Sequence, residues 1–237
     1  MLFSSMLFLW IFLPIVWIGN FLLNKIGGCR FANILLLITS IFFYAWGEPV
    51  YVFLMLFSIF INWLLGVVID KIDKTIFRRL VLILAIVINI SLLGYFKYAA
   101  ISVSTINRLF RTAFALPSIA LPIGISFFTF QALSYVIDVF KEEVPAQKNI
   151  FKLGLYISFF PQLIAGPIVK YKDISEQIDH RTLSVEQTSS GIRRFIYGLG
   201  KKVLISNTLA ACAEPLYLVA AEEESLLHIE IFLLYLH

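Results

Sequence analysis

The sequence predicts an all-α, polytopic transmembrane protein, and its composition gives the first reason. Of its 237 residues, 60% are hydrophobic and only 14% are charged, and the mean hydropathy is +0.90. A soluble domain of this size carries about 25% charged residues. The second reason is the pattern, because apolar stretches of about 20 residues, the length that crosses a bilayer, alternate with polar loops. We expect about six to seven membrane segments in a single membrane domain, residues 1–237.

The apolar segments follow one another along the chain. We predict them at residues 6–23, 30–46, 50–69, 80–98, 121–140, 151–169 and 203–221. No lysine or arginine precedes Lys25, so the first segment lacks the basic start of a secretory signal peptide and is interpreted as an uncleaved span. In residues 99–120, Arg108 and Arg111 share a helical face beside apolar side chains, which predicts an amphipathic helix in the membrane interface.

The basic loops predict the topology. Loops 25–30, 71–79 and 170–202 carry most of the positive charge, so we place them in the cytoplasm and the N-terminus outside. Three apolar segments separate the second loop from the third, and an odd number of full crossings would put these loops on opposite sides. One segment should therefore not span completely. We choose 151–169, because Pro161, Gly166 and Pro167 suit a re-entrant or broken segment packed inside protein.

Polar side chains inside the apolar segments are candidate site residues. Four of them follow i, i+3, i+4, i+7 spacing on one helical face: Gln131, Ser134, Tyr135 and Asp138. They either bond to neighbouring helices, which is the simpler interpretation, or line a substrate tunnel. Gln162, beside Pro161, either satisfies backbone groups freed by the break or contacts substrate.

The remaining polar residues indicate lipid contacts rather than metal or nucleic-acid binding. The net charge of +4 lies in loops. Such charge indicates the membrane topology and contact with anionic lipid, and it does not point to nucleic-acid binding. Arg194 and Lys201 would meet anionic headgroups or, alternatively, an acidic acyl carrier protein or the phosphates of coenzyme A. Cys29 and Cys212 show no disulfide or metal pattern, and the three histidines lack metal-ligand spacing.

Several motifs in a fixed order carry a family resemblance. They are residues 1–5 (MLFSS), 12–14 (FLP), 43–46 (FYAW), 93–98 (LGYFKY), 121–127 (LPIGISF), 134–139 (SYVIDV), 161–167 (PQLIAGP) and 201–203 (KKV). With them the chain resembles the N-terminal portion of the membrane-bound O-acyltransferase family, in its alginate O-acetyltransferase-like branch. The teichoic-acid D-alanyl transfer proteins are more distant cousins.

The resemblance implies an enzyme of the bacterial inner (cytoplasmic) membrane. It would transfer an acyl group from a thioester donor to hydroxyls of an exported polysaccharide such as alginate. The acyl group expected for this branch is acetyl. The donor would be acetyl-CoA or an acyl carrier protein. Accessory acetylation proteins would be partners, alongside the lipid bilayer, and no cofactor would stay bound.

The catalytic histidine of the family lies in an Arg-Trp-His segment, which this sequence does not contain. His180, His228 and His237 lack that context, so we expect no catalytic residue here and no activity from the chain alone, as in an N-terminal fragment. Two alternatives remain open. A transporter or channel component would also explain the intramembrane polar residues and the broken segment, although only one such region is visible. The other alternative is a non-catalytic membrane scaffold.

Overall fold

The computed structural model describes residues 3–111, 120–163, 166–167, 169–181 and 184–222. Within these ranges all regular elements are helical, which confirms the predicted all-α class. They are η1 (Phe8–Phe12), α1 (Leu13–Gly47), α2 (Tyr51–Lys71), α3 (Thr75–Phe110), α4 (Ile125–Phe140), α5 (Ile150–Ser158), α6 (Phe160–Leu163), α7 (Tyr171–Asp179), α8 (Val185–Gly200), η2 (Lys201–Ser206) and α9 (Asn207–Glu222). The chain forms two compact units, Met1–Arg181 and Thr182–His237. The expectation of a single membrane domain stays a prediction.

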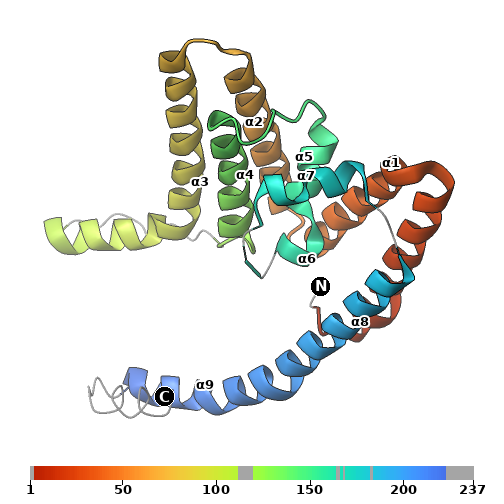
Figure 1. The fold of residues 1–237 in the computed structure, drawn as a ribbon. Coiled ribbons are helices and arrows are strands. Elements are labelled where there is room, and N and C mark those ends of the chain that lie inside the picture. The colour runs from red at the N-terminus through yellow and green to blue at the C-terminus, as the bar shows by residue number, and fades with distance from the viewer. Residues whose placement is uncertain (1–2, 112–119, 164–165, 168, 182–183, 223–237) are drawn as a thin grey trace. The chain divides into compact units, whose positions relative to one another are not determined.

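Helix α1 has a sharp bend where two separate spans were expected. Gly28 has non-helical backbone angles, φ 70° and ψ −170°, inside the element. A glycine reaches positive φ readily because it has no Cβ. The predicted segments 6–23 and 30–46 lie on either side of this residue, so they correspond to the two arms of α1 with η1 in front (Figure 1).

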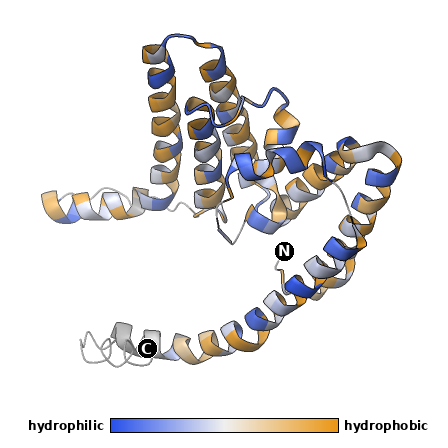
Figure 2. Cartoon of the chain, viewed as in Figure 1, coloured by the Kyte–Doolittle hydropathy of each residue, from blue (hydrophilic) through white to orange (hydrophobic). Residues whose placement is uncertain are grey.

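Helices α2 and α3 contain the next two predicted spans. Together with the stretch Phe8–Gly47, they are long and apolar enough to cross a membrane. Their exposed side chains include many large apolar ones, such as Phe53 and Leu80. Figure 2 shows that hydrophobic residues follow one another along both helices. Such surface suits contact with lipid tails. The protein is therefore a membrane protein, and the total of six to seven segments stays a prediction.

The predicted interfacial helix 99–120 lies only partly within the described residues. Its first half forms the C-terminal end of α3, which runs at a steep angle to the rest of that helix (Figure 1). Residues 112–119 lie outside the described residues. The interfacial position of this helix stays a prediction.

Helix α4 is central to the first unit and packs against α2, α3, α5 and α7. Ten of its 16 residues are buried. The turn before it depends on Gly124, which has φ 77°. A Cβ at this position would lie 2.9 Å from the carbonyl oxygen of Leu163. The glycine of the 121–127 motif therefore allows this turn to approach the end of α6 closely.

The segment predicted to be broken is broken: Gly166 and Pro167 lie outside any helix, as expected, and a further break comes before Pro161. Helix α5 has nine residues, which is too short to cross a bilayer. The helical path ends at Phe159, whose ψ is 112°, and α6 adds only one further turn. Pro161 lies in the first turn of α6, where a missing N–H is tolerated. The break therefore precedes the proline, and whether the segment is re-entrant stays a prediction.

A cluster of phenylalanines holds the short helix α6 in place. Phe160 packs against Phe8, Phe12 and Phe43, with ring centroids 6.1, 5.3 and 5.5 Å away. The cluster joins η1, α1 and α6 through edge-to-face and tilted contacts, which aromatic rings prefer. The broken segment is thus anchored by buried apolar surface close to its break.

The stretch 170–202, expected as a basic cytoplasmic loop, contains α7 and α8. Ser184 caps α8, because its hydroxyl accepts a hydrogen bond from the backbone N–H of Gln187 at 3.1 Å. The cytoplasmic location of this stretch stays a prediction.

Candidate functional site

The break after α5 frees a backbone carbonyl, and two predicted site residues bind it. In a continuous helix the carbonyl of Tyr156 would accept the N–H of Phe160. That N–H instead points to the hydroxyl of Ser40, at 3.3 Å. The side-chain amides of Gln131 and Gln162 donate to the Tyr156 carbonyl at 3.0 and 2.6 Å. These bonds support the packing interpretation for both glutamines.

Three tyrosines form a buried cluster beside this break. Tyr171 stacks edge-to-face on Tyr135 and on Tyr156, with centroid separations of 5.1 and 5.2 Å. The hydroxyl of Tyr156 donates to the carbonyl of Val169 at 2.7 Å. Burial raises the pKa of the Tyr171 phenol, so this group stays protonated at neutral pH. The cluster fixes α7 against α4 and α5.

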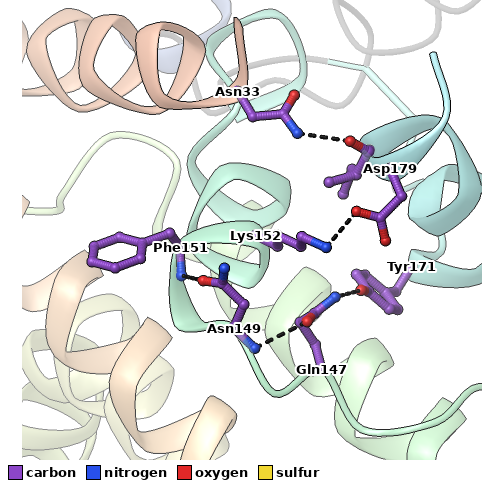
Figure 3. Close-up of polar contacts among 8 residues, drawn as sticks. Asn33, Gln147, Asn149, Phe151, Lys152, Tyr171 and Asp179 are labelled. Atoms are coloured by element: carbon purple, nitrogen blue, oxygen red, sulfur yellow. Dashed lines mark hydrogen bonds and ion pairs between the residues drawn. The ribbon is translucent and has the colours of Figure 1, made fainter. Parts of the chain in front are cut away.

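Gln147 links the loop after α4 to the same tyrosines. Its backbone N–H donates to the hydroxyl of Tyr135 at 2.9 Å, and its side-chain amide donates to that of Tyr171 at 2.7 Å. Figure 3 shows the second bond, together with the bond from the Asn149 N–H to the side-chain oxygen of Gln147. Gln147 was not among the predicted site residues, because a glutamine in a polar loop gives no signal of its buried partners.

Gly66 on α2 makes room for Tyr135. A Cβ at this position would lie 2.8 Å from the tyrosine ring. The close approach of α2 and α4 therefore requires a residue without a side chain here. Small residues at such crossings are typical of membrane helix interfaces. The only sequence signal was a glycine inside an apolar span.

The other two residues of the predicted polar face are also placed within the helix bundle. Asp138 is buried, and its Oδ2 has no hydrogen-bond partner among the described residues. Ser134 is half-buried. The face that carries them is thus enclosed mainly by protein, and a role in lining a tunnel stays a prediction.

A cavity of about 600 Å³ lies between α1, α5 and α7. Its wall combines apolar side chains such as Leu37 with polar ones, including Arg30 and His180. Lys152 and Asp179 form an ion pair across it, as Figure 3 shows. None of these residues belonged to the predicted site, because the cavity joins segments more than 100 residues apart in the sequence.

Two polar contacts shape the same cavity. The side-chain amide of Asn33 donates to the carbonyl of Ile178 at 2.7 Å and so ties α1 to α7 (Figure 3). The side chain of Asn149 caps α5 by accepting the N–H of Phe151 at 2.9 Å. Both amides hold the cavity wall in shape.

Arg181, at the end of the first unit, lies against the bend of α1. Its Nη2 donates to the side-chain oxygens of Asn20 and Asn33 at 3.2 and 3.5 Å, one on each side of Gly28. The Cys29 thiol lies 3.6 Å from the Arg181 carbonyl, within hydrogen-bonding distance for sulfur. Burial lowers the pKa of the guanidinium, although an arginine remains charged at neutral pH.

The two residues proposed to meet a donor or headgroups lie in the second unit. Arg194 is on α8 and Lys201 begins η2, and both side chains are exposed. Their binding role stays a prediction. Within the described part of the chain, no group of three or more histidine, cysteine, aspartate and glutamate residues could hold a metal ion.

The fold and the site define the general class: a polytopic helical membrane protein with buried polar groups around a broken helix. Comparison with known proteins narrows this class further. The chain is 41% identical over 219 residues to the "probable alginate O-acetylase AlgI" of Pseudomonas aeruginosa, covering 90% of this chain and 41% of that protein. It is 36% identical to the protein of that name from Azotobacter vinelandii, covering 90% and 43%. A peptidoglycan O-acetyltransferase from Helicobacter pylori is 33% identical over 242 residues, covering 90% and 46%.

These matches confirm the resemblance predicted from the sequence. The chain is similar to alginate O-acetylases and to a peptidoglycan O-acetyltransferase, which is consistent with the alginate O-acetyltransferase-like branch of the membrane-bound O-acyltransferase family. It spans about two fifths of the length of the curated relatives it matches. No family model matches the chain, and no solved structure matches it significantly.

Proposed function

We propose that this chain forms part of an O-acetyltransferase that acetylates hydroxyls of an exported polysaccharide such as alginate. The observation that carries the proposal is the 41% identity to an alginate O-acetylase over 90% of the chain. The named acceptors of the relatives, alginate and peptidoglycan, are both glycans. A glycan hydroxyl is therefore the acceptor class that these relatives share.

We assign this chain a positioning role in the reaction. Transfer of an acetyl group to a hydroxyl needs a base that removes the hydroxyl proton and donors that stabilise the oxyanion. The sequence contains no Arg-Trp-His segment, so we do not assign the catalytic base to this chain. The tyrosine cluster and the two glutamines at the helix break would form a rigid wall that fixes reactant positions.

We extend the proposal to the acyl donor and to the orientation of the protein in the membrane. An acyl thioester, acetyl-CoA or acyl carrier protein, would supply the acetyl group from the cytoplasm of a bacterium. Arg194 and Lys201 would attract its negative charge, and both side chains are exposed, as this role requires. The basic loops support an inner-membrane position with the N-terminus outside, where accessory acetylation proteins could act on the exported polymer.

A chimera tests the proposal. The matched segment of the Pseudomonas aeruginosa alginate O-acetylase would be replaced by the corresponding residues of this chain, in cells that lack their own enzyme. We expect acetyl esters on the secreted alginate from the chimera and none from this chain expressed alone. A chimera that reaches the membrane at the normal level but leaves alginate unacetylated would contradict the proposal and favour a scaffold or transport role. Turnover by the chain alone would contradict the positioning role.

Two glycine variants give a matched control for the chimera. Gly66→Leu would place a side chain into the Tyr135 ring, whereas at Gly94 a Cβ would meet no atom of the described residues within 4 Å apart from its own helix backbone and chain neighbours. We expect the first variant to abolish acetylation and the second to retain most of it. Equal acetylation by the two variants would show that the α2–α4 contact does not support the activity.

A further inference from the structure

Arg181 is a partly buried cation that pairs with no carboxylate among the described residues. The ion pairs formed by the described residues do not include it. Asp179, two residues away, pairs with Lys152 instead. A charge removed from water is unfavourable unless it is paired and hydrogen-bonded. The two asparagine oxygens satisfy hydrogen bonds but supply no counter-charge.

The Arg181 guanidinium also retains unused donors. Both of its hydrogen bonds in the described part of the chain leave from Nη2. Its Nε is buried and has no hydrogen-bond partner in the described ranges. A guanidinium offers five N–H donors in a fork that matches the oxygens of a phosphate. An oxyanion would satisfy both the charge and the remaining donors.

A cavity of about 200 Å³ lies beside this guanidinium. Arg181 lines it together with the amide side chains Gln162 and Gln177. The rest of the wall is mostly apolar and includes Leu36, Leu155, Phe159 and Ile174. This combination of one cation, two amides and hydrocarbon fits an amphiphile whose anionic head meets the arginine and whose chain lies along the apolar wall.

The bend of α1, to which Arg181 is bound, has the composition of a membrane interface. Lys25 and Arg30 flank Gly28, and the apolar side chains of Ile26 and Phe31, 83% and 57% exposed, lie beside them. Basic residues next to exposed apolar ones favour the headgroup region of a leaflet that contains anionic lipid. A phospholipid phosphate is the anion most abundant at that depth.

We propose that Arg181, with Asn20 and Asn33 holding its guanidinium, forms a binding site for the phosphate of an anionic phospholipid. The lipid would neutralise the arginine and occupy the adjoining cavity. Because Asn20 and Asn33 belong to the two arms of α1, the bound lipid would also stabilise the bend. The site does not depend on the proposed acetyltransferase activity and would exist in a scaffold or a transporter as well.

Lipid nanodiscs test the proposal. The purified chain would be reconstituted in phosphatidylcholine, with and without phosphatidylglycerol, and its Tm measured. We expect phosphatidylglycerol to raise the Tm by about 3 °C or more, because a ligand that binds only the native state stabilises it. The rise should vanish in Arg181→Gln and persist in Arg79→Gln, the same substitution at an exposed arginine. No rise in the unmodified protein, or an equal rise in Arg181→Gln, would overturn the proposal.

Two further measurements identify the ligand and guard against misfolding of the variant. Inorganic phosphate added to phosphatidylcholine discs should leave the Tm unchanged, and a rise equal to that with phosphatidylglycerol would identify a soluble phosphate compound instead. Native mass spectrometry of the unmodified protein should show retained phosphatidylglycerol in preference to phosphatidylcholine. Arg181→Lys keeps the charge and should keep this preference. Equal retention of the two lipids by the unmodified protein would exclude the site.

Discussion

Helices α4 and α8 both have 16 residues and both mix polar with apolar side chains, yet their surroundings differ completely. Ten residues of α4 are buried, and none of α8 is. Two polar side chains of α4 bond to other parts of the chain: Gln131 donates to the Tyr156 carbonyl, and the Tyr135 hydroxyl accepts the Gln147 N–H. The side-chain bond that Thr188 of α8 donates goes to Ser184 at its own N-terminus. Gln131 and Tyr135 of α4 therefore take part in tertiary packing, whereas Thr188 of α8 bonds within its own helix.

The apolar residues of the two helices differ in the same way. Phe128 and Val136 of α4 are fully buried, whereas Ile196 and Tyr197 of α8 are 60% and 73% exposed. Helix length and apolar content are thus not enough to place a helix in a core. Neighbouring elements must offer matching surface, and α2, α3, α5 and α7 do so for α4. Substitutions in the two helices should therefore have very different effects.

The largest difference in stability between variants of the two helices is expected when a tyrosine is truncated. Tyr135→Ala removes a fully buried ring and should lower the free energy of unfolding by about 3–5 kcal/mol, the range for buried aromatic truncations. The matched variant Tyr197→Ala on α8 should change it by about 0.5 kcal/mol or less. Unfolding of the purified protein with a denaturing detergent measures both. Similar losses in the two variants would mean that the α4 environment is not a packed core.

The glutamines at the helix break should show non-additive effects. Gln131→Ala and Gln162→Ala should each cost about 0.5–1.5 kcal/mol, because the remaining amide still donates to the Tyr156 carbonyl. The double variant should cost more than the sum, since that carbonyl is then left unsatisfied at the break. A double-mutant cycle in the same unfolding assay measures the coupling, with Gln187→Ala on α8 as a neutral control. Strict additivity would show that the two amides do not share this role.

A pair of buried asparagines between α2 and α3 should contribute to stability in the same way as the amides around α4. Asn62 and Asn89 exchange hydrogen bonds of 3.1 and 2.8 Å between α2 and α3. Asn62→Leu should destabilise by about 1–2 kcal/mol, because it leaves Asn89 without its partner. Adding Asn89→Leu should recover part of the loss. Failure of the second change to recover stability would indicate that side-chain volume, and not the hydrogen bond, decides this contact.

The smallest effect on stability is expected for the exposed ion pair between Glu143, after α4, and Lys172 of α7. A hydrogen bond and the charge of Lys172 lower the pKa of the Glu143 carboxyl. A lowered pKa means that the pair stabilises the fold above the ordinary glutamate pKa of about 4.3 and that this contribution is lost as the pH falls through the lowered value. The Tm difference between the unmodified protein and Lys172→Gln should therefore be small at pH 7 and shrink below about pH 4. Lys148→Gln serves as the control. A difference that grows in acid would contradict the pairing.

The contrast between α4 and α8 also shows how far sequence reasoning reached into the candidate site. The i, i+3, i+4, i+7 spacing correctly placed Gln131, Tyr135 and Asp138 on a face that turns out to be largely buried. It did not identify their partners, because the Tyr156 carbonyl and the Gln147 N–H are backbone groups that every residue has. Gly66 was missed for a related reason. A glycine reveals a close contact only when the side chain opposite it is known.

The helix break illustrates the same limit. Pro161, Gly166 and Pro167 correctly indicated that the segment could not be a continuous helix. Its exact position is set by tertiary contacts, because Phe160 is held by three phenylalanines from η1 and α1 and Ser40 lies close to its N–H. The proline then falls where a short helix tolerates it.

The sequence by itself determined the class of this protein, because hydropathy and charge act along the chain and do not depend on what folds against what. It likewise determined the family resemblance, which lies in the order of short motifs. Only the tertiary structure decided which polar groups meet: the two glutamines at one carbonyl, and Arg181 between the arms of α1. The physical reason is that such contacts join residues far apart in sequence, and their free energy depends on distances and burial that exist only once the helices have packed.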